Sequence, residues 1–235
     1  MLIEPEITGA SIVLVGNFNP AILSPDWFAR HDLIKDAAIN RTDPEFIVHP
    51  QITQFKFDWC QIVSEPNRFT MSSTQESFIR IADLTAKTFG ELLPHTPIRQ
   101  LGISRQVHFR VSNINIRDAL GFKLAPPESW GAWGVKVRAQ NATTRGGLRS
   151  LTMEQRVFET QRTGFLATKV EPSSLLPKGI GVFVQVNDHH DFDNNGPVEG
   201  AQAAMTLLRT SFESSIRNAE SIIDHIMRLA NEAHI

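Results

Sequence analysis

The chain has 235 residues, of which 41% are hydrophobic and 20% are charged, and its formal net charge at pH 7 is -2. This composition is typical of a globular protein and excludes disordered, collagen-like and disulfide-rich chains. No apolar run approaches the roughly 18 to 20 residues that span a bilayer, and residues 1–16 carry two acidic side chains where a signal peptide carries basic ones. We therefore expect a cytoplasmic protein with no membrane partner.

Charged residues are distributed unevenly along the chain. Residues 101–180, which we call the basic middle third, carry 12 Lys and Arg against 5 Asp and Glu, a net charge of +7. Residues 1–100 carry 8 against 12, and residues 181–235 carry 3 against 8. Such a basic stretch favours an anionic partner, and the alternative is a solvated surface whose charge the acidic flanks neutralise in the folded protein.

In chain order, the first half of the sequence predicts strands, a short helix and a long helix. The apolar run of residues 11–15 is typical of a strand, and Pro25 then opens a short helix. Residues 52–59 alternate apolar and polar side chains, as a strand with one buried face does, and Glu65-Pro66-Asn67 predicts a hairpin turn. A helix is expected over residues 75–93, because apolar side chains recur there every three or four positions.

The second half repeats this order of elements. A strand is predicted at residues 103–111, with Val107, Phe109 and Val111 on one face, and a short helix near residues 116–120. The remaining predictions are strands at residues 135–138, 148–157, 165–170 and 180–186, and a long amphipathic helix at residues 198–231.

Both halves thus consist of a strand, a short helix, antiparallel strands and an amphipathic helix, which suggests an internal duplication of residues 1–97 and 98–235. We predict a single α+β domain, residues 1–235, in which the strands of both halves form one curved antiparallel sheet. Two long helices would pack on one face of this sheet, leaving the other face exposed. In the predicted registers, the exposed face is lined by Lys56, Gln106, His108, Arg110, Lys136 and Arg138.

The richest polar cluster is residues 187–195, with the sequence Asn-Asp-His-His-Asp-Phe-Asp-Asn-Asn, directly after the predicted strand 180–186. Carboxylates and imidazoles bind divalent metals, and Asp188, His190 and Asp191 are the candidate ligands. A metal held there would activate water for hydrolysis. Successive side chains of a strand point to opposite faces, so these ligands converge only if the segment is a loop, and the alternative is an acidic surface loop.

The basic middle third contains a second candidate site. Trp130 and Trp133 precede a predicted flexible loop at residues 141–147, whose backbone amides suit phosphate. Exposed tryptophans stack on nucleic-acid bases, and the alternative is that both pack under the Gly-rich loop as core residues. The candidate partner-binding residues are basic side chains of this third, from the predicted strands 103–111 and 135–138 and from the loop and the residues after it: Arg110, Lys136, Arg138, Arg145 and Arg149.

Other catalytic signatures are missing from the sequence. Cys60 is the only cysteine, so it cannot form an internal disulfide, and its alternating surroundings predict a buried strand residue. No nucleophile elbow, phosphate-binding loop or dinucleotide fingerprint occurs. The sequence therefore assigns no catalytic residue, and it leaves open whether the protein is an enzyme.

Five short segments carry a resemblance that covers most of the chain: Asn67-Arg68-Phe69, Leu101-Gly102-Ile103, Ser150-Leu151-Thr152, residues 181–188 and Ser211-Phe212-Glu213. In this order they resemble an uncharacterised, sporadically distributed bacterial protein family of about this length. The arginine that the family shows in its Gly-led strand is displaced here to Arg105. The resemblance implies an α+β layout and a bacterial source, and it implies no activity and no catalytic residue.

The leading hypothesis is a non-enzymatic binding or assembly module that needs no cofactor and binds an anionic or protein partner through its basic middle third. The partner would be a protein or a nucleic acid, and a homodimer is compatible with this hypothesis. The alternative is a metal-dependent phosphoester hydrolase that uses Asp188, His190 and Asp191 to hold a divalent metal. A third hypothesis is a purely structural subunit of a larger complex.

Overall fold

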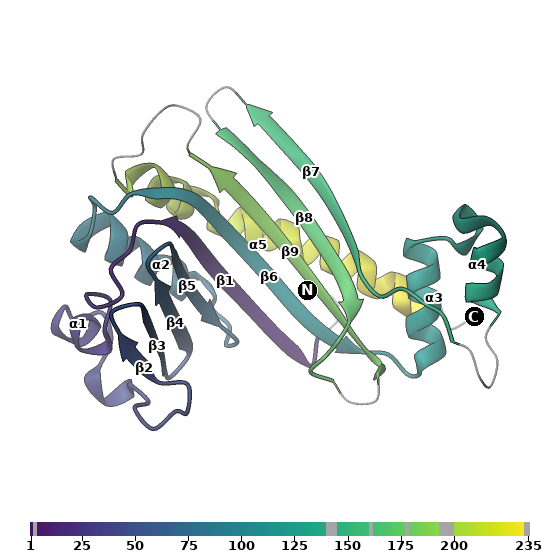
Figure 1. Ribbon diagram of the computed structural model, residues 1–235, viewed down its shortest axis with the longest axis horizontal. Coiled ribbons are helices and arrows are strands. Elements are labelled where there is room, and N and C mark those ends of the chain that lie inside the picture. The colour runs from purple at the N-terminus through teal and green to yellow at the C-terminus, as the bar shows by residue number, and fades with distance from the viewer. Residues whose placement is uncertain (2–3, 140–144, 160–161, 177–178, 193–199, 233–235) are drawn as a thin grey trace.

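Nine strands form one antiparallel sheet in the computed structural model, which describes residues 1, 4–139, 145–159, 162–176, 179–192 and 200–232 (Figure 1). From edge to edge, the strand order is β2-β3-β4-β5-β1-β6-β9-β8-β7. The two edges are different strands at opposite ends of this order, so the sheet is open. The predicted α+β class and the antiparallel sheet are therefore confirmed.

The first half of the chain supplies five strands and two helices, and its first strand lies near the centre of the sheet. That strand pairs with the last strand of the same half, so the first half runs outward from the centre in reverse order. The strands are β1 (Ile7–Gly16), β2 (Ile47–His49), β3 (Ile52–Phe57), β4 (Cys60–Glu65) and β5 (Arg68–Ser73). The helices are α1 (Pro25–Arg30) and α2 (Ile79–Lys87), with a 3-10 turn η1 (Asp36–Ala38) and a π-helical turn η2 (Thr88–Leu92).

The second half is arranged in the same way around its own first strand, which pairs with β1 on one side and with the last strand of its half on the other. Its strands are β6 (Ile98–Arg110), β7 (Leu151–Glu159), β8 (Arg162–Pro172) and β9 (Gly181–Asp191). Its helices are α3 (Ile114–Leu124), α4 (Gly131–Arg138) and α5 (Gln202–Asn231), with a 3-10 turn η3 (Pro127–Trp130) before α4.

Local sequence signals explain where several elements begin. The Ser24 hydroxyl accepts a hydrogen bond from the Trp27 backbone nitrogen at 3.3 Å and caps α1, whose first residue is Pro25. Pro66 and Asn67 form the tight connection between β4 and β5, because Glu65 pairs directly with Arg68. The predicted short helix and hairpin turn are therefore confirmed.

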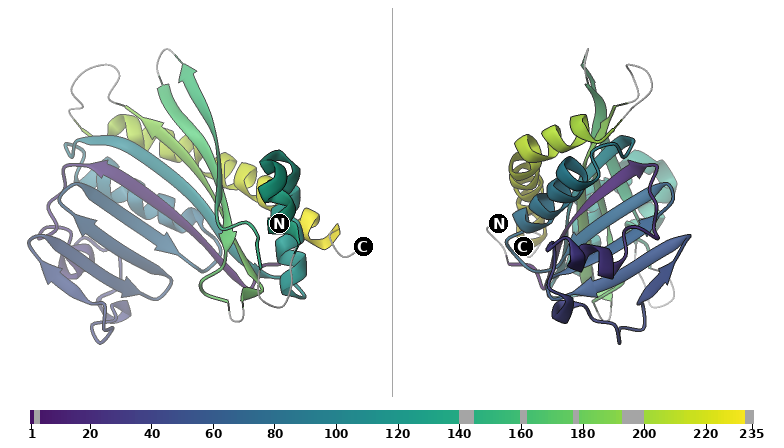
Figure 2. Two further views of the ribbon diagram at one scale, coloured as in Figure 1. Left: turned by 45° about the vertical axis from the view of Figure 1, so that its right-hand side comes forward. Right: turned by 90° about the vertical axis from the view of Figure 1, so that its left-hand side faces the viewer.

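The apolar stripe of α5 closes the core. This helix contacts β6, β9, α2 and α3, and Figure 2 shows α2 and α5 together on one face of the sheet. Its first half adds Met205, Leu208 and Phe212 to the core around β1 and β3–β6, and its second half adds Ile223 and Met227 to the core around β6 and β9. One helix thus completes the apolar packing of both halves of the sheet.

None of the helices in the described part of the chain combines the length and the apolar character that crossing a bilayer requires.

The prediction of two long helices is correct only for α5. The helix predicted at residues 75–93 is the shorter α2 followed by η2. It starts late because β5 continues to Ser73, whose hydroxyl binds the carbonyl oxygens of Trp59 and Gln75 and holds the chain in a turn.

The strand predicted at residues 135–138 is wrong, because these residues form the end of α4. A run of four alternating residues fits a strand and a helix equally well, and local packing decides between them. Here Gly134 packs directly on η3, where an added Cβ would lie 1.8 Å from the Pro127 carbonyl oxygen. Lys136 and Arg138 therefore belong to a helix rather than to the exposed face of the sheet.

The other residues predicted on the exposed face lie on strands, on the face that carries no helix. Lys56, Gln106 and Arg110 alternate with buried neighbours of β3 and β6. His108 is also on this face, but it is only 7% exposed because its ring packs against Phe183, at 4.7 Å between ring centroids. The prediction that His108 is exposed is therefore wrong.

Candidate functional site

Helices α3 and α4, the turn η3 and residues 145–150 form a lobe at one end of the molecule, which we call the α3–α4 lobe (Figure 1). Asn113 begins the lobe by accepting hydrogen bonds from the backbone nitrogens of Asn115 and Ile116, at 2.9 and 3.1 Å. Gly131 adopts a φ of 59° where η3 changes direction into α4. Because side chains rarely tolerate this conformation, glycine permits the turn that places α4 beside α3.

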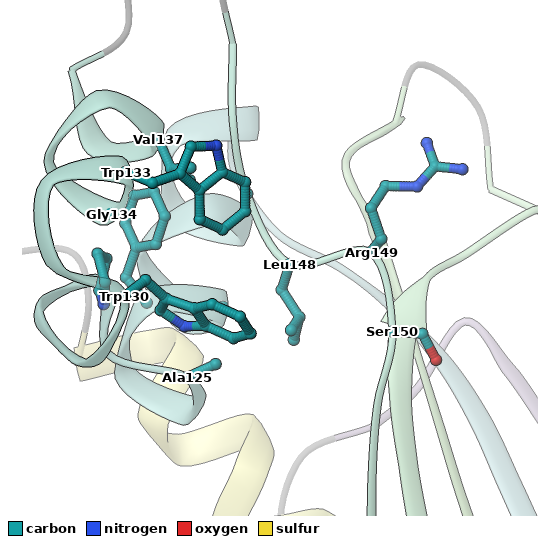
Figure 3. A pocket seen from close by; sticks show the side chains of 12 residues that line it. Ala125, Trp130, Trp133, Gly134, Val137, Leu148, Arg149 and Ser150 are labelled. Atoms are coloured by element: carbon teal, nitrogen blue, oxygen red, sulfur yellow. The ribbon is translucent and has the colours of Figure 1, made fainter.

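The α3–α4 lobe contains an open pocket of about 240 Å³ (Figure 3). The indoles of Trp130 and Trp133 lie at one side of it in an edge-to-face arrangement, with ring centroids 5.6 Å apart, and Leu148 lies opposite them. Arg149 lies beyond Leu148 as seen from the indoles. The pocket is lined by Gly121, Phe122, Ala125, Pro127, Trp130, Trp133, Gly134, Val137, Gly147, Leu148, Arg149 and Ser150.

The two tryptophans remain largely accessible to solvent. Trp130 is 60% exposed and Trp133 is 61% exposed, so the alternative that both are core residues under a Gly-rich loop is wrong. Large apolar side chains are usually buried, and an exposed pair at a concave surface is typical of a binding site. The lining offers one charged side chain, Arg149, and one hydroxyl, Ser150, so the pocket suits an apolar or aromatic group.

A buried carboxylate ties residues 145–150 to α3. Asp118 is 3% exposed and accepts hydrogen bonds from Arg117 Nη2 and Arg145 Nε, each at 2.9 Å. Arg145 Nη2 also donates to the side-chain oxygen of Asn115 at 2.9 Å. A buried charge is stable only when it is paired, so Asp118 and its two arginines fix the wall of the pocket that carries Leu148.

The five candidate partner-binding residues differ in their surroundings. Arg110 pairs with Glu6 through two contacts, at 2.5 and 2.9 Å, and Arg138 pairs with Glu128 beside the pocket. Arg145 is held by Asp118, as described above. Within the described ranges of the chain, Lys136 and Arg149 form no ion pair. Both side chains are exposed, and both belong to the α3–α4 lobe.

The candidate metal ligands lie within β9 rather than in a loop, so the predicted placement is wrong. Asp188 and His190 face α5, with 3.1 Å between Asp188 Oδ1 and His190 Nε2, and Ser215 of α5 donates to Asp188 Oδ2 at 2.5 Å. Asp191 faces the opposite side of the sheet, because successive strand residues alternate. There it accepts a hydrogen bond from Gln100 at 2.7 Å.

The three side chains therefore do not share one face of the sheet. Among the residues for which the structure gives positions, no three His, Cys, Asp or Glu side chains are arranged to hold a metal ion. Residues 193–195 of the predicted polar cluster and residues 141–144 of the predicted phosphate-binding loop lie outside the described residues.

A buried histidine and serine on the helix-free face resemble parts of a catalytic centre but are held by the backbone. His108 Nδ1 lies 2.8 Å from Ser173 Oγ, which also accepts hydrogen bonds from the backbone nitrogens of Leu175 and Leu176, at 3.1 Å each. Burial lowers the pKa of His108, and the charge of Glu171 opposes this shift. The pair thus stabilises residues 173–176, which follow β8, and its hydroxyl is buried.

The helix-free face also carries a polar recess of about 290 Å³ over β3–β6, lined in part by Lys56, Gln61 and Gln106. The ammonium group of Lys56 lies 2.7 Å from Glu45 Oε2 and 3.3 Å from Asp43 Oδ2. Its charge is therefore already matched by two carboxylates, and this recess gives less support for anion binding than the α3–α4 lobe.

No protein family model matches the chain, and no curated protein matches it. The bacterial family that the sequence resembles therefore remains an expectation.

Sequence reasoning named both tryptophans but missed the pocket that they line. The signal was their spacing of three, which places two side chains on the same side of a helical segment. We did not use this spacing to predict a pocket, because residues 135–138 were predicted as a strand and not as the continuation of a helix that carries Trp133. The opposite wall, Leu148, comes from a segment that the sequence placed at the start of a strand, and the contacts of Arg145 with Asp118 and Asn115 that link this segment to α3 are not local in sequence.

Proposed function

We propose that the protein is a non-enzymatic binding module whose α3–α4 lobe binds an acidic segment of a partner protein. The observation that carries this proposal is the exposed pair of Trp130 and Trp133 at an open apolar pocket. An aromatic or aliphatic side chain of the partner would enter the pocket between the indoles and Leu148. Tryptophans at the centre of an interface commonly supply a large share of its binding free energy.

The charge around the pocket supports an acidic segment. Arg149 and Lys136 are exposed cations without an ion pair among the described residues; Arg149 lines the pocket, and Lys136 lies on α4, the helix that carries Trp133. Carboxylates of the partner would meet these cations at the rim, where charge complementarity raises the association rate and sets orientation more than it raises affinity. Arg110, Arg138 and Arg145 are satisfied within the fold, so we assign them a smaller role.

A protein partner is favoured over a nucleic acid by two features of the lobe. Single-stranded nucleic acids are bound along grooves that combine stacking side chains with a continuous track of cations. Three of the five candidate cations are neutralised by carboxylates of the same chain, among them Arg138 and Arg145 of the lobe. The lining also offers few polar side chains with which to bind the edges of bases.

The test begins with selection of random peptides displayed on phage against the full chain, followed by affinity measurements on synthetic copies of the selected peptides. We expect sequences that contain an aromatic or aliphatic anchor next to Asp or Glu. Trp133→Ala should weaken their binding by about tenfold or more, because truncation of a central interface tryptophan commonly costs 2 kcal/mol or more. Met153→Ala is the matched control, because Met153 is an equally exposed apolar side chain outside the lobe, at 69%.

The contribution of charge is tested with the same peptides. The double variant Lys136→Ala, Arg149→Ala should lower the association rate and reduce its dependence on salt. Unchanged binding by this variant would show that the basic residues are not part of the site. A labelled mixed-sequence oligonucleotide at low and moderate salt completes the test, because selection of no peptide together with salt-sensitive oligonucleotide binding would overturn the proposal in favour of a nucleic acid.

The metal-dependent hydrolase is not proposed. Its three ligands would have to converge, and β9 directs Asp191 to one face of the sheet and Asp188 and His190 to the other.

A further inference from the structure

The sheet ends in an uncovered hairpin. Strands β7 and β8 pair over residues 151–159 and 162–170 without a bulge, and the hairpin projects from the body of the molecule in each view (Figures 1 and 2). β7 is the last strand in the sheet order, so it has a neighbouring strand on one side only. Its other side presents backbone amide and carbonyl groups to solvent over the length of the strand.

Edge strands usually carry features that prevent association with another strand. Such features are proline, a bulge, a very short length, a covering helix, or charged side chains that a neighbouring strand cannot match. β7 is nine residues long and contains no proline, and its regular pairing with β8 leaves no bulge. Residues 152–156 are exposed, including Met153 at 69%. This edge therefore has the properties of a strand that pairs with another chain.

We propose that β7 pairs antiparallel with β7 of a second copy of this chain, about a two-fold axis at Gln155. In such a pair, residues equally distant from Gln155 oppose each other, so Glu154 lies opposite Arg156 of the second copy, and Arg156 lies opposite Glu154 of the second copy. The two side chains share one face of β7, because Arg156 Nη2 lies 2.8 Å from Glu154 Oε1 within the chain. Each copy thus supplies the opposite charges that directly opposed strand positions favour.

The charges also select this register over its neighbours. An axis at Glu154 would place that carboxylate opposite itself, and an axis at Arg156 would oppose two guanidinium groups. Only the axis at Gln155 matches both charges at once, and the exposed Gln155 amide can hydrogen-bond to its own copy across the axis. A two-fold interface requires that the same surface of both copies be complementary to itself. The charge pattern of β7 has this property, which pairing with an unrelated strand does not require.

This inference does not depend on the proposed function of the α3–α4 lobe. The partner is a second copy, the interface is a backbone edge, and the residues that carry it lie on β7. The two copies would form one continuous sheet, with the two α3–α4 lobes next to opposite ends of the central β7–β7 pair and the two β2 strands at its outer edges. A bivalent binding module would result if both proposals are correct.

Sedimentation velocity over a range of concentrations tests the association of the full chain. We expect a dimer for the natural sequence. Arg156→Glu should weaken it by about tenfold or more, because two favourable charge pairs become two repulsive ones. The exchange variant Glu154→Arg, Arg156→Glu restores opposite charges in the opposed positions, and it should recover the dimer. Because all of these side chains are exposed, circular dichroism should show an unchanged fold.

An introduced disulfide between the two copies tests whether the two-fold axis lies at Gln155. Gln155→Cys should form a covalent dimer under mild oxidation, because the two introduced cysteines would lie directly opposite each other. Met153→Cys is the matched control. Its two copies would be four residues apart along the strands, about 13 Å, which is too far for a disulfide. The natural Cys60 is buried and does not interfere.

A chain that stays monomeric at every concentration would overturn the proposal. So would a dimer that is unaffected by Arg156→Glu and gives no Gln155→Cys cross-link, because its interface would then lie elsewhere.

Discussion

The two halves of the molecule arrange their strands alike but use their helices differently. In the first half, α1 lies against the sheet, where Phe28 packs on Phe55 of β3 with ring centroids 5.7 Å apart. In the second half, the corresponding helices α3 and α4 stand at the end of the sheet, where Leu120 of α3 shares a core with Val170 of β8, and the projecting part of the β7–β8 hairpin carries no helix (Figure 1). The second half therefore differs from the first in exposing an apolar pocket and a nine-residue edge strand, β7, whereas the edge strand of the first half, β2, has three residues.

The ion pairs of the two halves differ in how deeply their carboxylates are buried. In the first half, Arg41 contacts Asp26 and Asp36 at the surface, where both carboxylates are 67% exposed. In the second half, the carboxylate of Asp118 is buried beneath Arg145. Exposed pairs contribute little to stability, whereas a buried carboxylate that loses its charge or its partners destabilises the fold. Charge therefore stabilises the lobe of the second half, and apolar packing stabilises the first half.

The largest expected difference between the halves is in core packing. Phe69 is fully buried on β5, with the rings of Phe18 and Phe89 at 6.1 and 4.9 Å, so Phe69→Ala should lower the free energy of unfolding by about 3–5 kcal/mol. Phe165 on β8 is half-buried and stacks on His189, and Phe165→Ala should cost only about 1 kcal/mol. Urea unfolding of both variants measures this. Equal losses would contradict the comparison.

The ion-pair comparison predicts a smaller difference. Asp118→Asn leaves Arg117 and Arg145 without their shared carboxylate, so the free energy of unfolding should fall by about 2–4 kcal/mol. The matched variant Asp36→Asn removes one of two exposed carboxylates near Arg41, and its unfolding midpoint should hardly change. Urea unfolding at low salt compares the two. If both variants unfold at the same urea concentration, the buried ion pair stabilises the protein no more than the exposed one, and the comparison is wrong.

A pH effect should arise from the second half through His108. Burial lowers the pKa of this imidazole, so the unfolded chain takes up the proton first as the pH falls. The stability that His108 contributes is therefore complete above its ordinary pKa of 6.5 and is lost progressively below it. Unfolding midpoints between pH 7 and pH 5 measure this loss, and His108→Gln should show a shallower decline. An identical decline in the variant would exclude His108 as a source.

The smallest expected effect concerns a thiol in each half. Burial raises the pKa of Cys60 to about 12, so this thiol should resist alkylation at neutral pH while the protein is folded. A second cysteine introduced as Met153→Cys lies on the exposed edge of β7 and should react fully with iodoacetamide. Mass spectrometry of alkylated peptides distinguishes the two. Rapid labelling of Cys60 in the native protein would show that the core of the first half opens.

Prediction from sequence succeeded where a periodic pattern was long enough to choose one structure. The alternation over residues 52–59 gives β3, and the stripe over residues 198–231 gives α5 in the part of the chain that the structure describes. The short run at residues 135–138 failed for the opposite reason. Four residues do not distinguish a period of two from a period of 3.6, and the close contact between Gly134 and Pro127 is not local information.

The candidate sites were predicted less completely than the fold. Net charge correctly marked the middle third as basic, but a count of charges does not show which cations have partners. Glu6 reaches Arg110 from the beginning of the chain, and Glu128 and Asp118 neutralise Arg138 and Arg145. The metal cluster was misplaced because β9 continues five residues beyond the predicted strand end at Val186, which fixes an alternation that a loop would not have.

The position of α5 in the chain has a consequence for synthesis on the ribosome. All nine described strands precede this helix, and Met205, Leu208 and Phe212 complete one core while Ile223 and Met227 complete the other. Until α5 emerges, both halves would expose the apolar face of a sheet whose two edges are also open. Productive folding must therefore wait until α5 has been synthesised, and the nascent sheet is the stage at which a chaperone would be needed most.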